Sequence, residues 1–107
     1  MKQNKILSLL GLAARGRNLA SGEFQTEDAI RQGLAGLVIV AEDASANTRK
    51  MFTDKCSFYE IPIYIYGTKA DLGRAIGRAE RASLAVCDAG LAQAVQKLLE
   101  QAAADQG

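Results

Sequence analysis

The sequence predicts an α/β protein, a three-layer α/β/α sandwich with a mixed sheet of about four strands. Stretches with apolar residues at three- and four-residue spacing, typical of helices, alternate with short apolar runs, typical of strands. The central run, residues 37–41 (LVIVA), has no polar interruption, which is typical of a strand covered by helices on both faces. The pattern does not predict the order of the strands.

The N-terminal third is predicted to hold two helices joined by an extended segment. The first helix covers residues 2–14, and Gly16 is expected to close it in the left-handed conformation. Residues 18–21 form a short edge strand or an extended linker. The second helix opens at Gly22 and closes at Gly33.

After the central strand, helices and strands are predicted to alternate in the same way. Ser45 or Asn47 caps a third helix that runs to about residue 58, and Thr68 forms a capping box with Asp71 at the start of a fourth. The fourth helix ends at Gly77, and a loop follows. The remaining predicted elements are strands at residues 63–66 and 82–86, and a final helix whose apolar face holds residues 91, 95, 98 and 102 and whose end, residues 103–107, is frayed.

The composition fits one domain over residues 1–107. Of these residues 49% are hydrophobic and one is proline, which is enough for a real core. The sequence has no apolar run that could span a bilayer and no signal-peptide pattern, so we expect a cytoplasmic protein without membrane contact. Cys56 and Cys87 are expected to be buried free thiols. With no histidine in the chain, histidine-based triads and metal sites are excluded.

Charge is balanced over the chain, but the cations are clustered. Thirteen Lys and Arg residues against twelve Asp and Glu residues give a net charge of +1, which is not the excess of a protein held to nucleic acid by charge alone. Arg15 and Arg17 flank the end of the first helix, where they interact with the helix dipole, contact phosphates, or do both. The start of the second helix favours anions, but Glu23, Glu27 and Asp28 are more typical of a self-capped helix.

Carboxylates at the end of the central strand suggest one enzymatic alternative. Glu42 and Asp43 follow that strand at the rim of the sheet, where α/β proteins usually bind ligands, although Asp43 or Ser45 can also cap the next helix. Together with Asp88 they would form the site of a metal-dependent phosphotransfer enzyme. The sequence contains no phosphate-binding loop and no nucleophile elbow. We therefore expect no catalytic residues and no cofactor, and keep this enzyme as an alternative.

Four motifs taken together carry a resemblance to a known family. They are residues 11–17 (GLAARGR), 21–23 (SGE) with 29–31 (AIR), 41–48 (AEDASANT) and 72–77 (LGRAIG). The chain resembles the ribosomal-protein-like family whose members bind kink-turn RNA, and within it the small bacterial YlxQ-like branch. The resemblance extends from the first helix to about residue 95. It implies a four-stranded α/β/α sandwich that binds RNA.

The resemblance also implies where RNA would lie. Family members hold RNA through the start of the second helix, the turn after the central strand and the loop before the last strand, which here are residues 22–28, 42–43 and 77–81. After the glycine, the family's motif has Asn, then Glu or Gln, and after two further residues Lys; Phe24, Gln25 and Asp28 stand at these positions. The residues expected to contact RNA are Arg15, Arg17, Gly22, Glu23, Phe24, Gln25, Asp28, Asp43, Arg78 and Arg81.

Two departures from that motif change the expected chemistry. Gln25 fits, but Phe24 lacks the amide that would bond a base edge, and Asp28 puts a carboxylate where a cation would attract phosphate. Phe24 either stacks on a splayed base or, as ordinary burial tendencies favour, packs under the helix. These departures argue against tight, guanine-specific recognition but not against RNA binding.

The sequence therefore predicts a non-catalytic, monomeric RNA-binding protein. Its expected partner is structured, bent RNA, with ribosomal RNA among the candidates, and no small-molecule substrate is expected. Arginines contact the phosphates while the backbone of residues 22–25 approaches the bases. The alternative is a protein-interaction module on the same fold with weakened RNA affinity, suggested by the acidic second helix.

Overall fold

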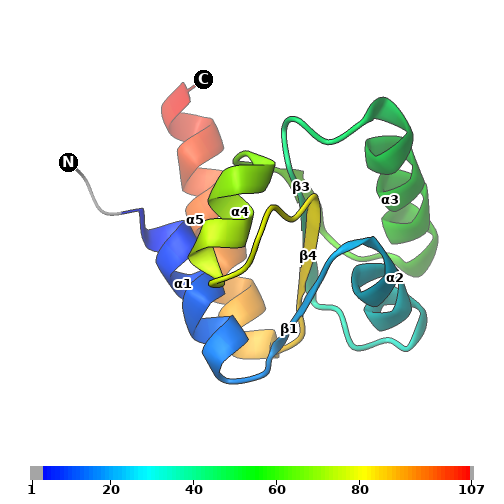
Figure 1. Ribbon diagram of the computed structural model, residues 1–107, viewed down its shortest axis with the longest axis horizontal. Helices are drawn as coiled ribbons and strands as arrows, with labels where there is room; N and C mark the ends of the chain where they lie inside the picture. Colours follow the sequence, from blue (N-terminus) through cyan, green and yellow to red (C-terminus); the bar gives the residue numbers. More distant parts are fainter. Residues whose placement is uncertain (1–3, 107) are drawn as a thin grey trace.

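The computed structural model describes residues 4–106, in which helices and strands alternate as predicted (Figure 1). In chain order the elements are α1 Lys5–Arg15, β1 Leu19–Ser21, α2 Glu23–Arg31, β2 Leu37–Val40, α3 Ala46–Tyr59, β3 Ile63–Ile65, α4 Lys69–Ala75, β4 Ser83–Val86 and α5 Ala89–Gln106.

The strands form one mixed sheet in the order β1-β4-β2-β3. β2 runs parallel to β3, whereas β4 is antiparallel to both β1 and β2. Val40, at the end of β2, lies opposite Ser83 at the start of β4, and Leu37 lies opposite Val86. The residues that follow β2 and those that precede β4 therefore share one rim of the sheet. β1 is an edge strand, as predicted.

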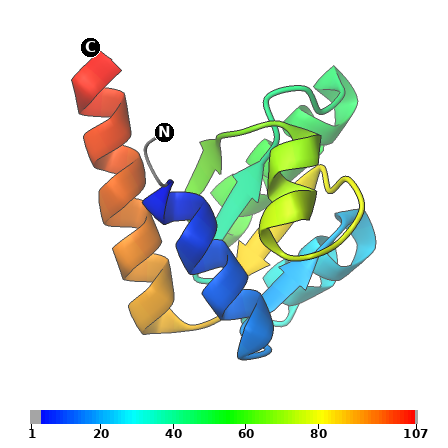
Figure 2. The same cartoon turned by 60° about the vertical axis from the view of Figure 1, so that its left-hand side comes forward.

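Helices cover both faces of this sheet. α1, α4 and α5 lie on one face, and α2 and α3 lie on the other (Figures 1 and 2). Every residue of β2 and β4 is buried, because both strands have a neighbour on each side and helices above and below. The predicted three-layer α/β/α sandwich is thus confirmed. Within residues 4–106, no helix is long and apolar enough to cross a bilayer.

The two cysteines differ in their surroundings. Both thiols are free; Cys56 is fully buried in the core, and this burial raises the pKa of its thiol to about 11. Cys87 is only half-buried, just after β4, and loss of hydration raises the pKa of its thiol as well. The expectation of a buried thiol is confirmed for Cys56 and was too strong for Cys87.

The end of α1 differs from the prediction by one residue. Gly16 has φ −88°, and the residue in the left-handed conformation is Arg17, with φ 61°. The backbone N–H of Arg17 donates to the carbonyl oxygen of Ala14 (3.1 Å), and that of Asn18 donates to Ala13 (2.8 Å). This pair of bonds is a Schellman motif with Arg17 at the position that glycine usually occupies. The prediction for Gly16 was wrong because the helix continues one residue further.

The other helix ends follow local capping. The predicted start of α1 at Lys2 lies outside the described residues; the helix begins after Asn4, whose side chain accepts from the N–H of Leu7 (3.1 Å). Ser45 caps α3, and Thr68 and Asp71 form the predicted capping box of α4. The predicted fraying from residue 103 was wrong, since α5 continues to Gln106 through a run of strong helix formers, and position 107 lies outside the described residues.

Candidate nucleic-acid interface

The start of α2 is an open backbone turn. Gly22 has φ 90° and ψ 162°, a conformation that side chains rarely allow, and its N–H donates to the carbonyl oxygen of Ser83 in β4 (3.0 Å). Apart from Gly22 and its two neighbours in the chain, no described residue lies within 4 Å of where a Cβ on Gly22 would stand. The glycine is therefore needed for its conformation, and the space beside it is open to a ligand.

Phe24 points into solvent from the first turn of α2. Its side chain is 75% exposed, so the interpretation that it packs under the helix was wrong. The buried residue of this turn is Thr26, whose Oγ1 accepts from the Oγ of Ser83 (3.3 Å). Two residues correspond to a rotation of about 200° around a helix, so burying Thr26 turns Phe24 outward.

A hollow of 480 Å³ lies between Phe24 and the residue 77–81 loop, and we call it the Phe24 hollow; it is lined by Ser21, Gly22, Glu23, Phe24, Gln25, Glu80, Arg81 and Ala82. Its far wall is held in place by Arg81. The Nε of Arg81 donates to the Oγ of Ser21 (3.3 Å), and its Nη1 donates to the carbonyl oxygens of Ala79 (3.3 Å) and Glu80 (2.9 Å). Arg81 therefore shapes the loop as well as carrying charge.

Gln25 links this hollow to two others. One, of 220 Å³, is lined by Gln25 together with Arg15 and Arg78. The other, of 270 Å³, is lined by Gln25 together with Arg17 and Asp28. The structure thus brings four arginines from two separate segments, the end of α1 and the residue 77–81 loop, around one amide side chain. We call these the arginine rim: Arg15, Arg17, Arg78 and Arg81.

Most of the negative charge on α2 is engaged by neighbouring cations and amides. Asp28 pairs with Arg31 (3.0 Å) and accepts from the Nε2 of Gln32 (2.7 Å). Glu27 pairs with Lys55 of α3 (3.1 Å). The repulsion expected from the acidic helix is weaker than the sequence suggests, because these partners offset two of its carboxylates.

Asp43 lies on the same rim of the sheet as the residue 77–81 loop, but its contacts are structural. Its Oδ1 accepts from the backbone N–H of Lys69 (2.8 Å), the first residue of α4. Asp43 therefore joins the turn after β2 to α4, while Ser45 caps α3. It does not line the three hollows around Gln25.

The carboxylates of the proposed phosphotransfer enzyme do not meet. Because β2 and β4 are antiparallel, Glu42 and Asp43 follow one end of the sheet, whereas Asp88 follows the other. The Oδ2 of Asp88 accepts from the N–H of Leu91 (2.9 Å), at the start of α5. Within the described residues, no group of three histidine, cysteine or acidic side chains could hold a metal ion. The hypothesis of a metal site from these three residues was wrong.

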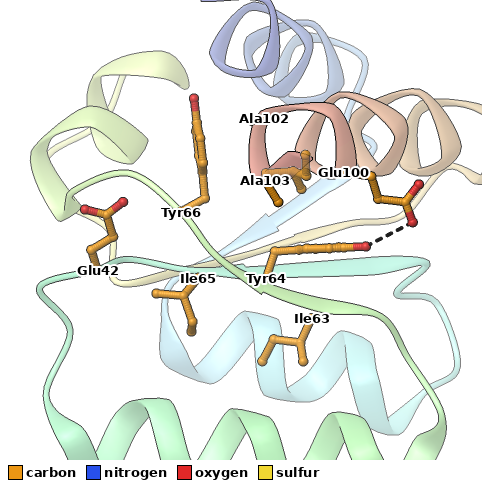
Figure 3. Close-up of a pocket in the computed structure, with 9 residues that line it drawn as sticks. Glu42, Ile63, Tyr64, Ile65, Tyr66, Glu100, Ala102 and Ala103 are labelled. Carbon is orange, nitrogen blue, oxygen red and sulfur yellow. Dashed lines mark hydrogen bonds between the residues drawn. The ribbon is translucent and has the colours of Figure 1, made fainter. Parts of the chain in front are cut away.

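A larger hollow, of 540 Å³, lies between β3 and α5 (Figure 3). Figure 3 shows Tyr64 pointing to Glu100, whose Oε2 lies 3.4 Å from the Tyr64 hydroxyl. Glu42 and Glu100 both line this space, and among the residues that the structure describes no lysine or arginine lines it. Two carboxylates without a cation make this hollow unsuitable for phosphate groups.

Two glycines that sequence reasoning did not assign a role place the residue 77–81 loop. A Cβ on Gly73 would collide with the carbonyl oxygen of Ala79, and one on Gly11 would lie 2.7 Å from that of Ala75. Both approaches are to backbone atoms that cannot simply rotate away. These glycines let α4 contact α1 and let the loop fold back over α4, which brings Arg78 close to Arg15. The sequence did contain a sign of this role, because both glycines lie inside stretches predicted to be helical, where glycine destabilises the helix.

Two known proteins are similar in sequence to this chain over most of its length. The chain is 46% identical over 92 residues to the RNA-binding protein YlxQ of Bacillus subtilis (strain 168), covering 86% of this chain and 92% of that protein. It is 38% identical over 98 residues to the RNA-binding protein YlxQ of Enterococcus faecium, covering 92% and 94% of the two chains.

A solved structure of a protein of unknown function from Bacillus halodurans C superposes with a TM-score of 0.88 at 45% identity, covering 92% of this chain and 99% of that one. Residues 4–101 match a family that includes ribosomal proteins. The similarity therefore extends through all the segments that form the arginine rim. On this basis the chain belongs to the ribosomal protein L7Ae/L30e/S12e/Gadd45 family.

Proposed function

We propose that this chain is a non-catalytic RNA-binding protein that holds structured, bent RNA against the arginine rim and the start of α2, with ribosomal RNA among the candidate partners. The observation that carries the proposal is the position of Gln25, which lines three hollows that also contain arginines. The family and the names of the two YlxQ relatives support it.

The chemistry of the interface follows from its parts. Guanidinium groups bind phosphate oxygens through paired N–H donors, and they come here from the end of α1 and from the residue 77–81 loop. The Gln25 amide, which has both donors and acceptors, lies among them. Because the arginines line three different hollows that meet at Gln25, we expect RNA that bends around the start of α2 to reach more of them than a straight duplex.

The conformation of Arg17 supports a role in binding. A non-glycine residue with φ near +60° costs about 1 kcal/mol, and glycine would relieve this cost. The end of α4 shows the alternative: Gly77, φ 71°, occupies the equivalent position, with the same pair of hydrogen bonds. Glu60, φ 58°, ends α3 in the same conformation, so what supports a role for Arg17 is this cost together with its place in a hollow beside Gln25.

The proposed function also has consequences for the localisation, oligomeric state and cofactors of the protein. We place it in the cytoplasm, as a monomer that acts through one RNA-binding domain spanning the chain, without a cofactor. Asp43 contributes by holding the turn after β2 to α4 and not by touching RNA.

Ultraviolet crosslinking in cells, followed by sequencing of the crosslinked RNA, tests the proposal. We expect the wild-type protein to recover a defined set of structured RNAs, and the double variant Arg17→Ala/Arg78→Ala to lose most of them. Arg49→Ala is the matched control, because Arg49 is an exposed arginine on α3, which lies away from α1 and the residue 77–81 loop (Figure 1). Equal recovery by all three proteins, or no RNA with the wild type, would contradict the proposal.

A protein-interaction role is the second candidate, and exposed aromatic side chains on α3 favour it. Phe58 and Tyr59 are 80% and 41% exposed, and their rings meet edge to face with centroids 5.0 Å apart. Exposed apolar side chains in contact often mark protein-binding surfaces. Partners that stay bound after ribonuclease treatment and are lost with Phe58→Ala would support this role; partners lost on ribonuclease treatment would rule it out.

A further inference from the structure

We infer that Phe24 is a stacking platform for one unpaired base, so that the RNA bound here carries an extruded nucleotide whose identity the protein reads only weakly. The inference rests on the proposed function, because it assumes that RNA lies against the start of α2. It adds the kind of RNA that the site selects.

The exposure of Phe24 is the first observation. A phenyl ring that is 75% exposed leaves a large apolar surface in water, and the opposite face of the same turn is fully buried through Thr26. Phe24 also lines the Phe24 hollow, and the place beside Gly22 where a side chain would stand is empty of other described atoms. A flat group can therefore reach the ring without displacing protein.

The turn that carries Phe24 is held rigidly. The N–H of Gly22 donates to Ser83, and the Oγ of Ser83 donates to Thr26, so the first turn of α2 is tied to β4 at two points on either side of Phe24. Across the hollow, Arg81 is fixed by Ser21 and by the carbonyl oxygens of its own loop. When a base binds between Phe24 and Arg81, the protein backbone around it should therefore lose little conformational entropy.

Phenylalanine determines which property of the base is recognised. Its side chain has no hydrogen-bond donor or acceptor, so it cannot distinguish the edges of the four bases, whereas every base has a face that stacks on an aromatic ring. Recognition by Phe24 therefore depends on whether a base is unpaired and accessible. A purine, with its larger ring system, should bind better than a pyrimidine by a small factor.

Fluorescence titration of a synthetic RNA tests the inference. The probe is an RNA duplex interrupted by an asymmetric bulge that contains 2-aminopurine, a fluorescent base whose emission falls on stacking. We expect the wild type to quench the probe, Phe24→Ala to bind about tenfold more weakly without quenching, and Phe24→Tyr to restore both. Phe58→Ala is the matched control, since Phe58 is as exposed as Phe24 but lies on α3, and it should bind like the wild type.

A second probe with an abasic site at the bulged position, whose binding is measured by electrophoretic mobility shift, separates stacking from other effects. If Phe24 stacks on that base, the tenfold difference between wild type and Phe24→Ala disappears with the abasic probe. A difference that persists would overturn the inference. If Phe24→Ala binds like the wild type while Arg17→Ala binds more weakly, stacking is wrong and RNA binding stands. If neither substitution weakens binding, both proposals fail.

Discussion

Two single residues, Arg17 and Phe24, take positions that the fold alone does not require. Arg17 occupies the left-handed position at the end of a helix, where glycine would cost less free energy. Phe24 exposes an apolar ring at a position where a polar side chain would be better solvated. Both lie at the edge of hollows that Gln25 also lines. Each residue is therefore locally unfavourable for the free energy of folding, and both lie at the surface where we propose that RNA binds.

Replacement of Arg17 separates its cost to the fold from its contribution to binding. Arg17→Gly should raise the free energy of unfolding by about 1 kcal/mol relative to Arg17→Ala, because alanine keeps the unfavourable φ and glycine does not. Both variants lose the guanidinium group and should weaken RNA binding to a similar degree. Chemical denaturation and RNA titration measure the two effects, and an Arg17→Gly protein no more stable than Arg17→Ala would contradict the assignment.

At this scale the sequence was a better guide to which residues lie near Gln25 than to the burial and partners of each side chain. Three of the four rim arginines, Arg15, Arg17 and Arg78, could be found because each lies next to a glycine near the end of a helix. The exposure of Phe24 could not be predicted, since it depends on which side chain of the turn faces the sheet, and Thr26 does so by bonding to Ser83, far away in the chain. The same applies to Asp28, whose partners Arg31 and Gln32 were visible in the sequence but whose pairing was not.

Helices and strands were largely predictable because their signals are local. Apolar spacing indicated α1 and α5, short apolar runs indicated β2 and β4, and the capping box of α4 was formed as expected. The ends of α1 and α5 were less accurate, since helix ends depend on caps and on neighbouring turns. The close approach of α4 to α1 could not be predicted, because it depends on which backbone atoms face Gly11 and Gly73.

Substitution of Gly73 tests how the residue 77–81 loop is placed. Gly73→Ala would force the carbonyl of Ala79 away, so it should destabilise the fold by about 1–3 kcal/mol, displace Arg78 and Arg81, and weaken RNA binding. Gly90→Ala is the control, because its Cβ would meet only the Oδ2 of Asp88, at 3.4 Å, and it should leave RNA binding unchanged. Thermal unfolding and RNA titration provide the two measurements. Wild-type stability and affinity in Gly73→Ala would show that the loop does not depend on this contact.

For the whole molecule, the layers were predictable but the strand order was not. β2 and β4 are both mainly apolar and both buried, so the pattern does not show that β4 lies between β1 and β2. That order decides which segments meet: it puts β1 and α2 beside the loop that precedes β4, and it sends Asp88 to the opposite end from Glu42 and Asp43. A net charge of +1 likewise conceals a cationic surface that forms only when α1, α2 and the residue 77–81 loop are assembled.

The salt dependence of RNA affinity tests most directly whether the arginine rim acts as one phosphate-binding surface. Each phosphate contact releases counterions, so Arg15→Ala, Arg17→Ala and Arg78→Ala should each lower the slope of log affinity against log salt by about one unit, and the losses should add when the substitutions are combined. Arg49→Ala, on α3, should leave the slope unchanged. Slopes that stay at the wild-type value in the three rim variants, or that fall equally in Arg49→Ala, would contradict the account.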